Sequence, residues 1–156
     1  MLLLLDIDGV MVPANSWRRP EILADGFVEF NPQAVNALNK ILRHNDFDIV
    51  LTTSHKFKYS LHQWLDIFSS RNITLNKIDR LPENIDQLNR KNEILNWFKS
   101  TTRNREFIIL DDDKSLNDLP ELLKARLVQT SASVGLTDYI AEEVLELAGK
   151  GYSEFI

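Results

Sequence analysis

Acidic and hydroxyl side chains follow three separate apolar runs in this sequence, and their types and order suggest phosphate chemistry. In chain order the groups are Asp6 and Asp8, then Thr52 and Thr53, then Asp111, Asp112 and Asp113. Carboxylates that meet at one place repel one another unless a hard cation lies between them, and Mg²⁺ prefers such oxygen ligands. The sequence therefore predicts a magnesium site that binds and orients a phosphoryl group.

Each residue type has its own use in such a site. A carboxylate can attack phosphorus and form an aspartyl-phosphate. A second acid two residues later can protonate the leaving group and afterwards activate water. Gly9 permits a sharp turn after the first acids and a close approach of backbone N–H groups to phosphate. A threonine hydroxyl and a lysine ammonium would hold the remaining phosphoryl oxygens.

The elements that must position these residues read as an α/β fold. Apolar runs predict strands over residues 2–7, 47–52, 73–78, 106–110 and 125–129. Helices are predicted from Pro32, which Asn31 caps, and over residues 60–68, 89–99, 119–124 and 137–148. Alternating strands and helices predict a three-layer, Rossmann-like parallel sheet of about five strands with helices on both faces. Function in such sheets lies at the carboxyl ends of the strands, where all three polar groups fall.

The segment Asp6-Ile7-Asp8-Gly9-Val10 resembles the opening motif of the haloacid dehalogenase (HAD) superfamily. The resemblance implies Asp6 as the nucleophile and Asp8 as the general acid/base. It also implies that Mg²⁺ is bound by Asp6, Asp8 and Asp112, with Asp111 as a supporting acid. The cofactor expected is therefore Mg²⁺, and the activity expected is a phosphatase.

The second and third motifs of that superfamily match less distinctive residues. The second comes from Leu51-Thr52-Thr53-Ser54-His55, where Thr53 is preferred over Thr52 as the catalytic hydroxyl. Gly9, Thr52 and Ser54 are then expected to lie against phosphate. The third motif, a lysine near the start of a helix, matches Lys91, and Lys77 is the competing candidate.

The intervals between the motifs leave no room for a cap domain, so we expect one HAD-like domain over residues 1–156. An open site suits phosphate on a large partner such as a nucleic-acid end or a protein. Thr53-Ser54 and Gly135-Leu136-Thr137 are similar to the HAD domain of Swiss Army Knife RNA-repair proteins, although His55 stands where that subgroup usually has an aromatic residue.

Basic and aromatic residues near the motifs could form a substrate rim. The basic candidates are Arg18, Arg19, Lys56 and Lys58, with His55 lining the pocket. Trp17, Phe57 and Tyr59 lie among them, which makes stacking on nucleobases conceivable. The competing interpretation, which we prefer, is a solvated loop whose aromatic side chains pack inward.

Composition excludes several classes of protein. The chain has 156 residues, no cysteine and a formal net charge of −5, which argues against coating nucleic acid by bulk electrostatics and excludes thiolate chemistry. The apolar start at residues 1–5 is cut by Asp6 and is too short for a signal sequence. We therefore expect a cytoplasmic protein with no membrane partner.

Three alternatives to a small-metabolite phosphatase remain at this stage. One is an enzyme that processes phosphorylated nucleic-acid ends. Another is a HAD-like protein that binds phosphate or nucleic acid without catalysis, although both Asp6 and Asp8 argue against it. A receiver-type signalling domain would place one phosphorylated aspartate on a middle strand, where this chain has Thr52 and Thr53 instead.

Overall fold

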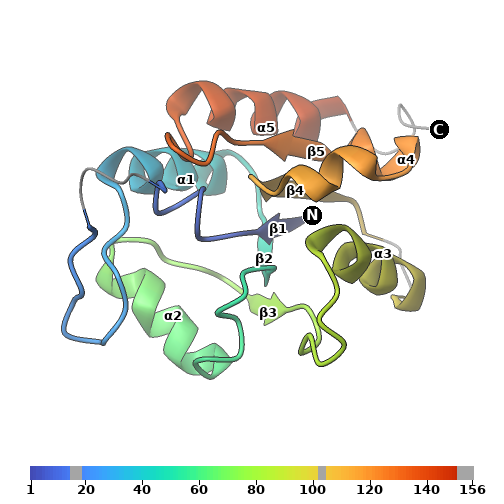
Figure 1. The fold of residues 1–156 in the computed structure, drawn as a ribbon. Coiled ribbons are helices and arrows are strands. Elements are labelled where there is room, and N and C mark those ends of the chain that lie inside the picture. The colour runs from blue at the N-terminus through green and yellow to red at the C-terminus, as the bar shows by residue number, and fades with distance from the viewer. Residues whose placement is uncertain (15–18, 102–104, 151–156) are drawn as a thin grey trace.

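The computed structural model describes residues 1–14, 19–101 and 105–150. Its centre is a five-stranded, all-parallel sheet in the order β3-β2-β1-β4-β5 (Figure 1). The strands are β1 (Leu2–Leu5), β2 (Asp48–Leu51), β3 (Ile78–Arg80), β4 (Phe107–Asp111) and β5 (Leu127–Gln129). The predicted Rossmann-like α/β fold is confirmed.

Helices cover both faces of the sheet (Figure 1). Side chains alternate along each strand, so Leu3 and Leu5 enter one core cluster and Leu4 enters the other. The first cluster includes residues of α1 (Pro32–His44), α2 (Leu61–Ser70) and α5 (Asp138–Lys150). The second includes residues of α3 (Arg90–Ser100), the 3₁₀ helix η1 (Lys114–Asp118) and α4 (Glu121–Lys124). β1 and β4 are thus covered on both sides, as their continuous apolar sequences predict.

Helix starts follow the capping residues. The Asn31 side chain accepts a hydrogen bond from the Gln33 amide, and Pro32 follows as the first helical residue. Ser60 and Gln63 form a reciprocal capping box at the start of α2. These caps fix where each helix leaves the carboxyl edge of the sheet.

Two predicted boundaries are wrong. The third strand lies at Ile78–Arg80, where it pairs with Ile49–Leu51 of β2, and not over residues 73–78. The Ile73 amide donates instead to the Phe68 carbonyl at the end of α2, which holds the start of that segment away from the sheet. The last helix continues through Gly149 to Lys150 rather than stopping before the glycine.

The long segment between β1 and α1 forms no cap domain in its described part. A single antiparallel bridge joins Ile22 to Val28. The buried Arg71 guanidinium ties this turn to α2 by donating to the carbonyls of Phe27 and Val28 and to the carboxylate of Asp25. None of the described helices is long and apolar enough to cross a membrane.

Candidate active site

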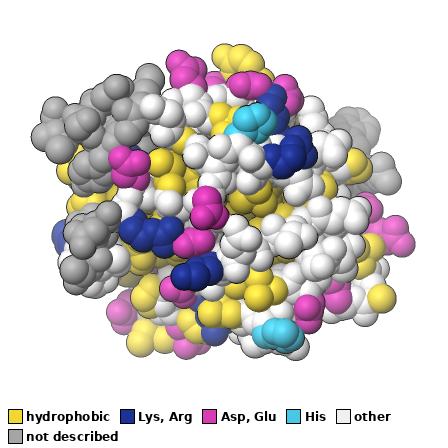
Figure 2. Space-filling model, turned by 180° about the vertical axis from the view of Figure 1, so that it is seen from behind, with side chains coloured by type: hydrophobic (Ala, Val, Ile, Leu, Met, Phe, Trp, Pro, Cys, Tyr) yellow, Lys and Arg dark blue, Asp and Glu magenta, His cyan; other side chains and the backbone are white. Residues whose placement is uncertain are grey.

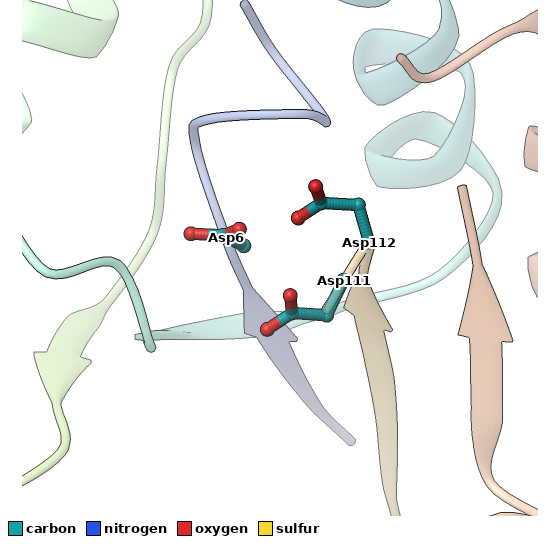
Figure 3. A group of neighbouring side chains, drawn as sticks. All are labelled: Asp6, Asp111 and Asp112. Carbon is teal, nitrogen blue, oxygen red and sulfur yellow. The ribbon is translucent and has the colours of Figure 1, made fainter. Parts of the chain in front are cut away.

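Three carboxyl groups meet where β1 and β4 end (Figure 3). Leu5 pairs with Leu110, and the Asp6 amide donates to the Leu110 carbonyl at 3.1 Å. This register brings Asp6 beside Asp111 and Asp112, and one carboxylate oxygen from each of the three lies within 4.8 Å of the other two. The structure thus brings together three of the four residues expected around the metal.

The electrostatics of this cluster favour a cation. Burial raises the pKa of Asp6, the negative charge of Asp111 and a side-chain hydrogen bond with Asp112 raise it further, and Arg90 opposes the change. Burial likewise raises the pKa of Asp111, again against the effect of Arg90. Without a metal, Asp6 therefore tends to hold a proton that a bound cation would replace.

The donor set fits Mg²⁺. Oxygen ligands of one Mg²⁺ lie about 3–4 Å apart, given metal–oxygen distances of roughly 2.1 Å, so only a small contraction of the cluster would be needed. Asp111 is already engaged: its Oδ2 accepts from Thr52 Oγ1 at 3.2 Å, and its Oδ1 accepts from the Asp113 amide at 3.1 Å. Asp6 and Asp112 are therefore the better candidates for direct ligands.

Gly9 makes room for Asp112. Its φ of 82° lies in the left-handed region, and a Cβ built there would come within 2.2 Å of Asp112 Oδ2. The expected sharp turn is thus present. The Gly9 amide itself donates to the Val12 carbonyl at 2.8 Å, so that particular N–H is already engaged within the protein.

Arg90 is the cation that reaches the carboxyl cluster, and the sequence analysis missed it. Its Nη1 lies 2.5 Å from Asp111 Oδ2 and 3.5 Å from Asp6 Oδ1. Burial alone would lower the pKa of Arg90, but the charges of Asp111 and Asp6 outweigh that effect and raise it. Lys91 was predicted for this place, yet within the described residues its ammonium contacts no carboxylate; its amide donates to Ser115 Oγ. Lys77 lies before β3, at the opposite end of the sheet.

The two threonines after β2 are both fully buried and have different partners. Thr52 joins the carboxyl network through Asp111 and also accepts from Arg90 Nη1 at 3.3 Å. Thr53 Oγ1 accepts from the His55 amide at 3.2 Å, while Ser54 is exposed. Thr53 as the catalytic hydroxyl remains a prediction, and Thr52 is the threonine that the structure links to the cluster.

Asp8 lies apart from the three clustered carboxyls. Its side chain is 59% exposed, and its Oδ2 is 2.8 Å from His55 Nε2. A side chain in this position is suited to exchanging protons with a substrate and water rather than to closing a buried metal site. His55, singled out as a pocket residue, is thus beside the expected acid/base.

The predicted basic rim is only partly present. Lys56 is wrong as a rim residue because it is buried and forms an ion pair of 2.9 Å with Glu93 on α3. Arg19 and Lys58 are exposed, and Arg18 lies outside the described residues. On the face in Figure 2, acidic and basic side chains are interspersed among the described residues, without a continuous basic patch.

A further loop supports the turn after Asp8. Thr130, just after β5, donates to the Gly9 carbonyl at 2.7 Å. The Leu136 amide donates to the Val10 carbonyl at 2.8 Å, and a Cβ on Gly135 would lie 2.7 Å from that same oxygen. The Gly135-Leu136-Thr137 signal in the sequence therefore marks a contact with the first motif.

A parallel sheet with a carboxyl cluster at the end of its central strand, and a second acid two residues beyond, defines a HAD-type α/β domain. Residues 2–141 match the family model described as "HAD domain in Swiss Army Knife RNA repair proteins", and the chain belongs to this family. No curated protein and no solved structure gives a significant match. The resemblance suggested by the sequence motifs is thereby confirmed.

Proposed function

We propose that this chain is a Mg²⁺-dependent phosphomonoester hydrolase that acts through an aspartyl-phosphate on Asp6. The observation that carries the proposal is the buried cluster of Asp6, Asp111 and Asp112 at the carboxyl edge of the sheet, with Asp8 exposed two residues from Asp6. Asp6 would then serve as both nucleophile and metal ligand, Asp112 as a further ligand, and Asp8 as the proton donor at the same edge. When bound by Asp6 and Asp112, Mg²⁺ would neutralise charge on the phosphoryl oxygens.

The proposed reaction has two steps at phosphorus. In the first, an Asp6 carboxylate oxygen forms a bond to phosphorus, the ester P–O bond breaks, and the leaving oxygen takes a proton from Asp8. In the second, water attacks the same phosphorus, Asp8 takes the proton from that water, and the Asp6–phosphorus bond breaks. Asp8 returns to its starting protonation state, so the cycle balances.

Neighbouring groups prepare Asp6 and the phosphoryl group. Arg90 supplies positive charge beside both Asp6 and Asp111, which is the role expected of Lys91 from the sequence. Thr52 and the Asp113 amide hold Asp111, and Asp111 in turn holds Arg90. These groups are fixed before substrate arrives, as electrostatic stabilisation of a phosphoryl transition state requires.

A specific surface favours phosphorylated nucleic-acid ends as the second candidate substrate. Phe57 follows the second motif, is 44% exposed, and has the Arg80 guanidinium 4.0 Å from its ring centre. Lys58, the next residue in the chain, is exposed, and its ammonium lies 5.7 Å from the centre of the Tyr59 ring. An aromatic face and two cations next to an uncapped site suit the stacking and phosphate contacts of a single strand. The family's description as RNA-repair domains agrees with this candidate.

The test is phosphate release from a panel of an aryl phosphate, small metabolites, and 3′- and 5′-phosphorylated oligonucleotides, with Mg²⁺ and with chelator. Asp6→Asn should abolish turnover and leave no acid-stable phosphoenzyme, while Asp8→Asn should slow both steps. Turnover that persists in Asp6→Asn, or that chelator leaves unchanged, would refute the mechanism. Phe57→Ala should raise KM for oligonucleotides about tenfold and leave the aryl phosphate unaffected if nucleobases stack there.

A further inference from the structure

The Asp8 side chain is exposed, although the residues next to it in the chain are buried, and it has one side-chain partner among the described residues. That partner is His55, whose Nε2 lies 2.8 Å from Asp8 Oδ2. An exposed aspartate without such a contact rotates among its staggered rotamers, and only some of them would direct the carboxyl towards a leaving group. A contact that selects one rotamer therefore bears directly on proton transfer.

His55 is itself held on several sides. Its backbone amide donates to Thr53 Oγ1 at 3.2 Å, so the residue is fixed to the end of β2. Its ring meets the ring of Phe27 edge-on, with centroids 5.6 Å apart at an interplanar angle of 76°. These contacts determine where Nε2 can lie, and with it the Asp8 carboxyl.

Phe27 provides a rigid wall behind the histidine. It is 3% exposed and packs edge-on against Trp64 of α2 at 5.3 Å between centroids. Arg71 donates to the Phe27 carbonyl at 3.1 Å, which anchors the backbone of this residue to α2. The chain of contacts thus runs from a helix in the core through Phe27 and His55 to Asp8.

We propose that His55 is the positioning residue for the general acid/base Asp8: it holds Oδ2 and leaves Oδ1 to exchange the proton with the leaving group and with water. The inference rests on the proposed function, because it assigns His55 a role in that reaction. The contact serves both steps, since an imidazole Nε2–H can donate to Oδ2 of the carboxylate and also to the carbonyl oxygen Oδ2 of the acid protonated at Oδ1.

The test separates positioning from packing by varying the leaving group. An alkyl phosphate needs a proton on its departing alkoxide, whereas p-nitrophenyl phosphate releases a stable phenolate with little help. The rate of phosphoryl transfer to Asp6 is measured in a single turnover for both esters, in wild type, His55→Phe and His55→Gln. Phenylalanine keeps a ring against Phe27 and removes the nitrogen; glutamine keeps a donor and an acceptor.

His55→Phe should slow transfer from the alkyl ester about 10–100-fold and transfer from the aryl ester only slightly, and His55→Gln should restore much of the alkyl rate. Equal losses on both esters, or no loss, would overturn the positioning role while the hydrolase proposal stood. A wild-type protein that released phosphate from neither ester and from no member of the substrate panel, the oligonucleotides included, would overturn the hydrolase proposal and the role of His55 with it.

A second measurement does not depend on activity or on a variant of His55. In the ¹⁵N–¹H NMR spectrum of the wild type, the His55 ring N–H should be protected from exchange with water, and Asp8→Ala should remove that protection. A ring proton that exchanges equally fast in both proteins would contradict the contact itself.

Discussion

A Cβ added at Gly9 should disrupt the carboxyl cluster, and the fold offers a matched control at Gly26. Both glycines have nearly the same φ, 82° and 83°. A Cβ at Gly26 would meet only Tyr59 Oη at 3.9 Å, an ordinary contact, whereas at Gly9 it would lie 2.2 Å from Asp112 Oδ2. The two alanine variants therefore share the backbone strain and differ in the displacement of Asp112.

The strain of alanine at this φ should cost about 1–2 kcal/mol of unfolding free energy in either variant. In Gly9→Ala the Asp112 carboxyl must also move, and displacing a metal ligand should weaken Mg²⁺ binding by at least tenfold. At 100 times the wild-type dissociation constant, Mg²⁺ stabilises the wild type by about 2.7 kcal/mol. A hundredfold weaker site would be stabilised by only about 0.4 kcal/mol at the same concentration.

The assay is denaturant unfolding of wild type, Gly9→Ala and Gly26→Ala, each with chelator and with Mg²⁺, together with calorimetric titration of the metal. In chelator, Gly26→Ala should have a lower free energy of unfolding than the wild type, and Mg²⁺ should raise that free energy by as much as it does in the wild type. Gly9→Ala should lose most of that gain. If Gly9→Ala bound Mg²⁺ as tightly as Gly26→Ala, Asp112 would not be the ligand that Gly9 accommodates, and the reasoning would be wrong.

Three further predictions concern charged groups. Arg90→Gln should lower turnover about 10²–10³-fold, while Lys91→Gln should keep turnover near that of the wild type. Thermal melts check that both variants are folded. A large loss of turnover in Lys91→Gln and a small one in Arg90→Gln would instead favour Lys91 as the catalytic cation. In chelator, Asp6→Asn should raise the free energy of unfolding by on the order of 2 kcal/mol at pH 8 and by less at pH 6. The reason is that the raised pKa of Asp6 makes folding of the wild type less favourable as pH increases above about 4. Parallel pH profiles of the unfolding free energy for the two proteins would contradict this. Hydrogen bonding to Arg71 lowers the pKa of Asp25 to about 2. This pair should therefore stabilise the fold by about 1 kcal/mol above pH 4, and that contribution should disappear between pH 4 and 2. In acid unfolding experiments, the free energy of unfolding of Asp25→Asn should fall by about 1 kcal/mol less than that of the wild type between pH 4 and 2.

The parts of the site that could be predicted are those fixed by strand order and strand ends. Asp6, Asp111 and Asp112 each follow a run of buried apolar residues, and parallel strands bring such positions to one edge of the sheet. The alternation of strands and helices likewise predicts a parallel sheet with helices on both faces. These inferences need only local sequence patterns and a general rule of topology.

The parts that could not be predicted depend on side-chain direction and on distant partners. Arg90 and Lys91 are adjacent at the start of α3, and one residue of helix turns a side chain by about 100°, which decides which of them meets Asp111. The sequence around Lys56 is typical of an exposed loop, whereas its burial depends on the ion pair with Glu93 on the distant α3. Thr130 supports the Gly9 turn from the far end of the chain, and nothing in its local sequence indicates that contact.

The pairing of β1 with β4 also determines when during synthesis the carboxyl cluster can form. Leu2 pairs with Phe107, so the acids at the two strand ends lie far apart in the sequence. After Asp6 has been made, its partners Asp111 and Asp112 follow only when β2, β3 and three helices have also been made. Any metal site that needs all three carboxyl groups can therefore form only after β4 has been made, and a fragment that ends before β4 would lack two of the three.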